Sequence, residues 1–525
     1  MPTIEMPTRT GAIKPDPVPR SAGGLTRRAS LNVVASLLDW GAKVAVGFFV
    51  TPVLVGGLGQ SLFGVWEMLT RLVGYVNVAD VRPTEILKLV IANRQTVKDG
   101  TIQRRQVGSA VGVWAICLPA LVIVGAILVW FVPVITKVSP ELYGLVRVAC
   151  ALLVLNLLLI NLVAIPESIL RGMNLGYRRM GLQAGLSVVG GALAVIAIYL
   201  GLGLIGVAGV QVVLSALTGL MFCYVAKRYV AWFGIARPTL AEVRFFLGLS
   251  LWNYVGALVT YLLLASDIII LGVATQTSTV TTYVLNGYAA QATIGVMSLA
   301  LGALTPGLGG VVGQKQHDWA ARLRHEMLSV SWLSVTVIGS TILLWNRSFL
   351  SLWVGASYYA GFWVNLLIAL IMVQTVFIRT DAYVIDTTLR LRGRVAMSAV
   401  AVLVFIPLTV ALTWVWGMVG LCLGILSGRL VQTISYPILA NSCLGRPKRI
   451  SFHALIRPGL AMCLLFAGSG YLGQRLLSRN WLEWVLGVGI SVALIVCVAI
   501  VAGLSAETRG QLARRLRMLW IQASS

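Results

Sequence analysis

The sequence is short of charge, and short of acidic residues above all. Only 11% of its 525 residues are Asp, Glu, Lys or Arg, whereas 58% are hydrophobic. A soluble protein carries about a quarter charged residues, because charge keeps its surface in contact with water. This composition excludes an ordinary soluble protein and predicts that much of the surface faces lipid.

The residues of metal, redox and catalytic sites are also scarce. The chain has three histidines, none at the spacing of metal ligands, and its seven cysteines form no CxxC pair. Six of these cysteines lie in apolar stretches, where free cysteine packs as a small hydrophobic residue. No Walker motif and no nucleophile triad occurs. We therefore expect no metal, no cofactor, no catalytic residue and no enzymatic activity.

Long apolar segments, in contrast, follow one another along the chain. A bilayer core of roughly 30 Å is crossed by about 20 apolar residues in a helix. Backbone amides in lipid must be paired internally, so such segments are expected to be helical. The sequence predicts an all-α polytopic membrane protein with about 14 transmembrane helices between residues 30 and 504.

Positive charge is concentrated in alternate connections between these segments. Most of the 41 Lys and Arg lie in the two tails or near residues 98, 175, 236, 320, 392 and 449. Because Lys and Arg are retained on the cytoplasmic side, both termini are predicted to be cytoplasmic, in a bacterial inner membrane. A net charge of +24 that is spread over many loops reflects topology and not nucleic-acid binding.

The same loops indicate an internal repeat. Three basic residues recur in later loops at one offset of 219 residues. They are Arg105, Arg171 and Lys227, followed in the same order by Arg324, Arg390 and Arg446. Parallel repeats of this kind are related by an axis along the membrane normal. We predict a disordered cytoplasmic tail (residues 1–29) and two six-helix lobes (30–226 and 245–441) joined by a cytoplasmic linker (227–244). A pair of additional helices (442–504) and a basic cytoplasmic tail (505–525) follow.

Charged residues inside apolar segments are the candidate functional residues, because each costs about 2.5–3.5 kcal/mol at the middle of a bilayer. With a rise of 1.5 Å per residue, Lys43, Arg71 and Arg429 are expected near mid-depth. Further cations are expected nearer the two rims: Arg147 in the outer third, and Arg82, Lys88 and Arg379 on the inner side. Fixed positive charge suits an anionic substrate, and guanidinium can bind such a group through two hydrogen bonds. We assign these cations to a substrate-binding cavity.

A structural interpretation of the same residues stays open. Asp39–Lys43 and Glu67–Arg71 have the i,i+4 spacing of pairs on one helical face, so each could be a neutralised pair between helices. Asp39 and Asp267 are candidates for ion coupling, by carrying protons or binding sodium. Each could equally be the buried partner of a cation.

Two segments resemble a known family. Residues 58–80 read LGQSLFGVWEMLTRLVGYVNVAD, and residues 166–180 read PESILRGMNLGYRRM. The first is similar to the second-helix region of polysaccharide flippases in the multidrug, oligosaccharidyl-lipid and polysaccharide exporter superfamily, through Phe63-Gly64-Val65-Trp66 and Asp80. The second is similar to the connection after that family's fourth helix, through Gly172, Asn174 and Tyr177. Val81-Arg82 stand where the family often has a glycine.

The resemblance implies a V-shaped bundle of two lobes around a central cavity. It implies a polyprenyl-pyrophosphate-linked oligosaccharide as substrate, moved from the inner to the outer leaflet by alternating access for cell-surface polysaccharide export. The expected partners are this lipid-linked oligosaccharide, membrane lipids, and a polysaccharide polymerase with its export machinery.

Two other functions are weighed against this one. An ion-coupled multidrug exporter of the same superfamily is expected to have a more acidic or apolar cavity, because its substrates are commonly cationic. A membrane glycosyltransferase or polymerase is expected to have a large charged external loop, whereas the outer connections here are short.

Overall fold

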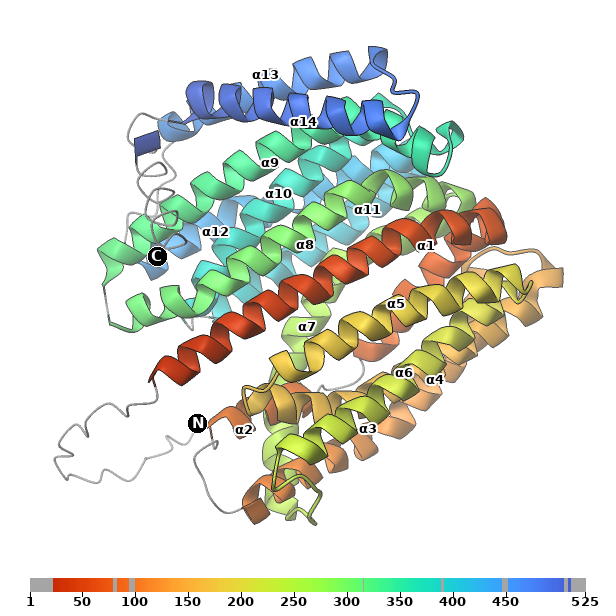
Figure 1. The fold of residues 1–525 in the computed structure, drawn as a ribbon, viewed down its shortest axis with the longest axis vertical. Coiled ribbons are helices and arrows are strands. Elements are labelled where there is room, and N and C mark those ends of the chain that lie inside the picture. Colours follow the sequence, from red (N-terminus) through yellow and green to blue (C-terminus); the bar gives the residue numbers. More distant parts are fainter. Residues whose placement is uncertain are drawn as a thin grey trace.

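The computed structural model describes residues 22–78, 83–93, 100–314, 316–388, 391–445, 452–504 and 509–510. Within these ranges the chain forms α-helices with short 3₁₀ and π segments and no β-strand, so the predicted all-α fold is confirmed. The helices, shown in Figure 1, are α1 (Ala22–Val78), α2 (Pro83–Asn93), α3 (Gly100–Ile135), α4 (Tyr143–Gly172), α5 (Tyr177–Tyr199), α6 (Gly203–Tyr229), α7 (Leu240–Ala274), α8 (Thr277–Gly313), α9 (His317–Trp353), α10 (Phe362–Thr387), α11 (Leu391–Gly428), α12 (Leu430–Cys443), α13 (Phe452–Arg475) and α14 (Trp481–Val498).

Two of these helices are interrupted by a glycine with non-helical backbone. Gly59 in α1 has φ 74°, and Gly417 in α11 has φ 56°. A residue with a Cβ rarely adopts positive φ, so glycine permits the chain to turn there. Figure 1 shows α1 reaching one end of the bundle and turning back. Each of the two helices therefore contributes to two crossings, and α2 and α12 continue the second crossing of each.

The long helices are suited to a bilayer. Ten stretches of the described chain are long and apolar enough to cross a membrane. Two of them, Ser36–Asn77 and Arg392–Cys443, contain 42 and 52 residues. At 1.5 Å per residue these would extend about 60 and 80 Å, roughly twice or more the hydrocarbon thickness of a bilayer. The chain is a multi-pass membrane protein.

The helices pack in two main sets. In the first, α4 packs on α3 and α6, and α5 packs on α6 and α1. In the second, α10 packs on α8, α9, α11 and α12, and α13 and α14 cover α9. Contacts of α1 with α7 and α8, and of α7 with α3 and α11, join the sets (Figure 1). The lobe boundaries given above stay a prediction, and α1 already covers residues 22–29 of the proposed tail.

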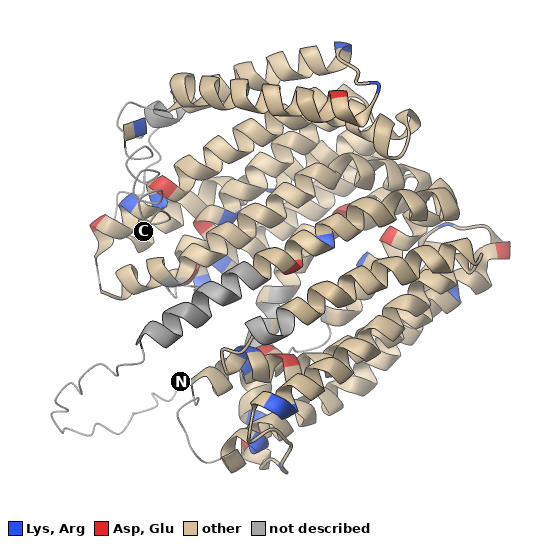
Figure 2. Ribbon diagram, viewed as in Figure 1, with Lys and Arg blue, Asp and Glu red and all other residues tan. Residues whose placement is uncertain are grey.

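The two ends of the bundle differ in charge. The start of α1 and the α4–α5, α6–α7 and α8–α9 connections lie at one end, called here the Ala22 end (Figure 1). Gly59, Gly417 and the α5–α6 connection lie at the other, the Gly59 end. In Figure 2 most of the described Lys and Arg residues lie toward the Ala22 end. This grouping agrees with the alternating pattern of basic loops in the sequence.

Candidate functional site

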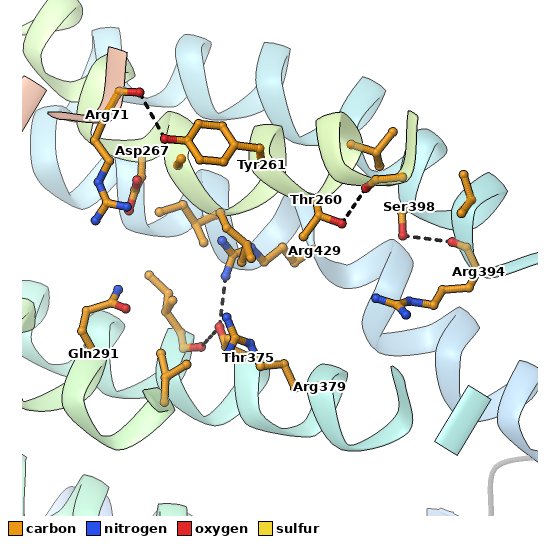
Figure 3. A pocket seen from close by; sticks show the side chains of 18 of the residues that line it. Arg71, Thr260, Tyr261, Asp267, Gln291, Thr375, Arg379, Arg394, Ser398 and Arg429 are labelled. Atoms are coloured by element: carbon orange, nitrogen blue, oxygen red, sulfur yellow. Dashed lines mark hydrogen bonds between the residues drawn. The ribbon is translucent and has the colours of Figure 1, made fainter. Parts of the chain in front are cut away.

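A cavity of about 820 Å³ lies where the two sets of helices meet. Its walls come from the second half of α1, from α2 and α7, and from α8, α10 and α11. Figure 3 shows its polar side chains, four of which are arginines: Arg71, Arg379, Arg394 and Arg429. Three of these four were assigned to a binding cavity from the sequence, and the structure brings them together.

Arg429 is the most deeply buried of these arginines. It lies between α11 and α12, and only 7% of its surface is exposed. Its guanidinium donates to Thr375 Oγ1 at 3.0 Å and to the Leu263 carbonyl at 2.5 Å, and it lies 5.8 Å from the Phe405 ring centre. Its Nε is buried and has no hydrogen-bond partner. The cation is thus hydrogen-bonded to neutral groups, interacts electrostatically with Asp267, and retains donor capacity at Nε.

Arg71 lies in the second half of α1, at a depth that matches Arg429. Each arginine is 12 residues beyond the glycine at which its helix turns, Gly59 or Gly417, which corresponds to about 18 Å along the helix. Figure 3 shows the Arg71 side chain beside Asp267. Glu67 interacts electrostatically with Arg71, but none of the ion pairs of the described chain joins Glu67 to Arg71.

The other two arginines extend the cavity toward the Ala22 end. Arg379, on α10, donates to the Ser298 hydroxyl and is close enough to Arg429 for electrostatic interaction. Arg394, near the start of α11, pairs with Asp386. Like charges in a medium of low dielectric constant repel one another, so an anion between Arg379 and Arg429 would relieve this repulsion.

Among the described residues, Asp267 is the one carboxylate that lines this cavity. It lies on α7, where Oδ2 accepts a hydrogen bond from the Tyr283 hydroxyl at 3.2 Å and Oδ1 accepts one from the Ile268 amide at 2.9 Å. With four arginines against this single acid on its walls, the described cavity is electropositive.

Other residues assigned from the sequence lie elsewhere. Lys43 pairs with Asp39 at 2.9 Å along α1, and its side chain is 48% exposed. Lys88 pairs with Glu85 on α2. None of these residues is among those that line the cavity.

One further assigned cation is also separate from this group. Arg147, on α4, stacks over the Trp130 ring at 4.4 Å and donates to the Trp130 carbonyl at 3.4 Å, away from the cavity lining. Arg82 lies outside the described residues.

Arg394 belongs to the basic loop near residue 392 in the sequence and was not predicted to line the cavity. Uncharged polar residues on the apolar helices were not predicted either, and of these Gln291 on α8 and Thr375 on α10 line the site. A search for polar side chains within apolar segments would have found both, because such side chains are costly to bury without a partner.

The bundle is closed at the Gly59 end by hydrogen bonds between α1 and the start of α8. Ser61 Oγ lies 3.0 Å from Thr277 Oγ1, and the Thr281 hydroxyl donates to the Gln60 carbonyl at 2.6 Å. The Gln60 side chain donates to the Ser278 carbonyl at 3.3 Å and to Thr282 Oγ1 at 3.1 Å. We call these four contacts the polar clasp.

Close backbone packing accompanies the clasp. A Cβ at Gly64 would lie 1.9 Å from the Thr277 carbonyl oxygen, so glycine is needed for this approach. At the other end of the molecule the cavity lining reaches Arg394, near the start of α11. The cavity therefore extends from mid-depth toward the Ala22 end and is shut off from the Gly59 end.

Comparison with protein-family models and with curated protein sequences gives no match. Solved structures share the fold. The lipid II flippase MurJ, in an inward closed conformation, has 13% sequence identity and a TM-score of 0.69, with 89% of this chain and 98% of that chain covered. An inward-facing multidrug resistance MATE family transporter of the MOP superfamily has 16% identity and a TM-score of 0.60, covering 80% and 98%.

A third structure is a MOP superfamily transporter from Pyrococcus furiosus, described by the reverse polarity of its binding pocket. It has 14% identity and a TM-score of 0.52, with 81% of this chain and 96% of that chain covered. At these identities the likeness concerns the fold. The chain therefore has the fold of the MOP superfamily transporters, over most of its own length and nearly all of theirs.

Proposed function

We propose that this protein is a flippase that moves a polyprenyl-pyrophosphate-linked oligosaccharide from the inner to the outer leaflet of a bacterial inner membrane. Transport would proceed by alternating access, with both termini and the Ala22 end in the cytoplasm. The product would supply cell-surface polysaccharide export, where a polymerase and export machinery use it.

The observation that carries this proposal is the buried guanidinium of Arg429. A charge at mid-depth in a bilayer is tolerated beside water, a counter-ion or a substrate. Arg429 is hydrogen-bonded to a hydroxyl and a carbonyl, and its Nε is free. With Arg71 at the same depth and Arg379 close by, the cavity offers three cations to one anionic group. A pyrophosphate provides the oxygens that such a group of guanidinium side chains binds well.

The state of the cavity agrees with loading from the cytoplasm. The cavity reaches the Ala22 end, where basic residues gather, and the polar clasp closes the opposite end. A substrate in the inner leaflet could place its head group among the arginines while its polyprenyl chain remains in lipid. The solved structure of a lipid II flippase with this fold supports a lipid-linked substrate.

We further propose that Asp267 couples transport to an ion gradient. Its carboxylate lines the cavity near Arg71, so its charge opposes an anionic substrate. Binding of a proton or sodium ion there would remove that repulsion. Asp39, the other candidate from the sequence, forms an ion pair with Lys43.

The electropositive lining is unfavourable for the multidrug-exporter alternative, because a cationic drug would meet the charges of Arg71, Arg379 and Arg429. Reconstitution separates the two functions. Proteoliposomes that contain the protein and an undecaprenyl-pyrophosphate-linked oligosaccharide should expose the sugar to an impermeant lectin faster than protein-free liposomes. Uptake of a cationic dye without any movement of the lipid-linked sugar would instead establish the exporter and overturn the flippase proposal.

A further inference from the structure

A smaller pocket opens from the cavity into the second set of helices. Its volume is about 220 Å³, and its walls come from α7, α10, α11 and α12. The two spaces are continuous, because both are lined by Thr260, Thr375, Arg379, Arg394, Ser398 and Arg429. The side pocket therefore begins beside two of the arginines proposed to bind the pyrophosphate.

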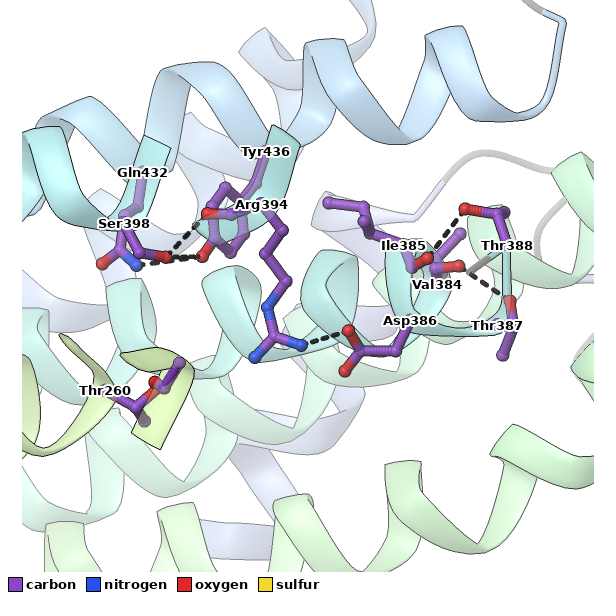
Figure 4. Close-up of polar contacts among 11 residues, drawn as sticks. Thr260, Val384, Ile385, Asp386, Thr387, Thr388, Arg394, Ser398, Gln432 and Tyr436 are labelled. Carbon is purple, nitrogen blue, oxygen red and sulfur yellow. Dashed lines mark hydrogen bonds and ion pairs between the residues drawn. The ribbon is translucent and has the colours of Figure 1, made fainter. Parts of the chain in front are cut away.

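The side pocket adds further polar groups, those of Asp386, Gln432 and Tyr436, to the arginines that it shares with the cavity. The Tyr436 hydroxyl lies 2.6 Å from Ser398 Oγ and accepts a hydrogen bond from Gln432 Nε2 at 3.1 Å (Figure 4). These three side chains are buried, with exposures of 7% or less. Arg394 is neutralised by Asp386 within the same pocket. The side pocket thus combines a neutral network with a closed ion pair.

Hydrogen-bonding capacity remains free in this network. In the described part of the chain, Gln432 Oε1 accepts no hydrogen bond, and Asp386 uses Oδ1 alone for Arg394. The Thr260 hydroxyl donates to the Gly256 carbonyl at 2.8 Å and keeps its lone pairs. A ligand in this pocket would therefore meet these acceptors together with the guanidinium donors of Arg379 and Arg429, which requires a ligand that both donates and accepts hydrogen bonds.

This requirement distinguishes between the parts of a lipid-linked sugar. Phosphate oxygens have no proton to donate at neutral pH and would face the Asp386 carboxylate. A polyprenyl chain would leave buried polar groups unpaired, at a cost of about 1–3 kcal/mol each. Sugar hydroxyls both donate and accept, and they suit amide, hydroxyl and carboxylate partners together.

We propose that the side pocket holds the sugar unit attached to the pyrophosphate, with Gln432 and Asp386 as its specificity-determining residues. The inference rests on the proposed flippase function, since Arg379 and Arg429 place the pyrophosphate at the mouth of the pocket. It adds a recognition site for the first sugar to the cationic site for the head group. A sugar chain that begins with a residue too large for this pocket should bind poorly.

Two probes test the proposal on the full-length protein in nanodiscs. The first is undecaprenyl pyrophosphate, and the second is the same lipid carrying one sugar, supplied separately as glucose, galactose or N-acetylglucosamine. The wild-type protein should bind at least one of the sugar-bearing lipids more tightly than the bare lipid. Gln432→Leu should weaken binding of that lipid by about three- to tenfold, as expected for a neutral hydrogen bond, and change binding of the bare lipid less than twofold.

A matched control is available on α10. Gln374 is also a buried amide, with 9% exposure, and donates to the Leu426 carbonyl at 2.9 Å and to Thr433 Oγ1 at 3.1 Å, but it does not line the side pocket. Gln374→Leu should affect both lipids equally. If Gln432→Leu lowers the melting temperature by more than Gln374→Leu does, its loss of binding could reflect unfolding. Tyr436→Phe then serves as the test variant, because it removes only one hydroxyl group.

The outcomes separate the two proposals. Equal losses for both lipids in Gln432→Leu and Tyr436→Phe, or a wild-type protein with no preference for any sugar-bearing lipid, would overturn the sugar site and leave the flippase function standing. A wild-type protein that binds neither the bare nor the sugar-bearing lipids would overturn the flippase function, and the sugar site with it.

Discussion

Replacement of Arg429 by glutamine is the most direct test of the cationic cavity. Arg429→Gln removes the charge while keeping amide donors for Thr375 Oγ1 and the Leu263 carbonyl, both of which accept hydrogen bonds from Arg429. A hydrogen bond to a charged group contributes about 1.5–3 kcal/mol. Since each 1.4 kcal/mol is a factor of ten, Kd for undecaprenyl pyrophosphate should rise by about 10- to 150-fold.

The assay compares variants of one protein in nanodiscs, with binding and melting temperature measured on the same samples. Arg147→Gln is the matched control, because Arg147 is an arginine of the membrane-spanning helices that contacts Trp130 outside the cavity. It should change the Kd less than twofold. Arg429→Lys should lie between wild type and Arg429→Gln, because it keeps the charge without the planar fork.

The stability measurement decides what a loss of binding means. Arg429→Gln should fold with a melting temperature close to wild type, because it removes a buried charge and keeps donors for the two neutral acceptors. Unchanged binding together with a clear fall in melting temperature would refute the reasoning. Arg429 would then be a structural cation, and the cavity would need another basis for function.

Three further results are expected. Cysteines that replace Ser61 and Thr277, whose hydroxyl oxygens are 3.0 Å apart, should form a disulfide that stops transport until reductant is added. Undiminished transport by the fully cross-linked protein would show that the polar clasp does not open. Asp267→Asn should tighten binding of undecaprenyl pyrophosphate and make flipping in proteoliposomes independent of an imposed proton or sodium gradient. If flipping still depends on the gradient, Asp267 is not the coupling group. Single cysteines at positions 98 and 320 should be protected from an impermeant thiol reagent in intact cells, and labelling of either would contradict the predicted topology.

The sequence predicted the helical crossings well, because apolar length and the need to pair backbone amides leave few alternatives in lipid. The resemblance placed the second-helix region at residues 58–80, and Gly59 turns the chain at its start. Pro83 is the first residue of α2, a position where a helix tolerates the missing N–H of proline.

The candidate site was predicted in part. Depth followed from the rise per residue, which placed Arg71 and Arg429 at one level, and the structure shows both in the cavity. Which face of a helix meets the cavity depends on packing. Lys43 was placed near the same depth, but α1 packs on α5 and α8, and its Lys43 lies outside the cavity lining. Arg394 was assigned to a loop, because a charge count cannot tell a loop arginine from one at the start of a helix.

The polar clasp has a consequence for how easily the molecule can change its accessible side. Its four contacts are neutral hydrogen bonds, and water can replace each of them when the helices part. A neutral hydrogen bond contributes about 0.5–1.5 kcal/mol net, so opening would cost roughly 2–6 kcal/mol for the set. A ligand or ion that binds the open state more tightly by a few powers of ten could supply this amount. The clasp could therefore open and re-form within the proposed transport cycle at a cost that binding of a ligand or ion can offset.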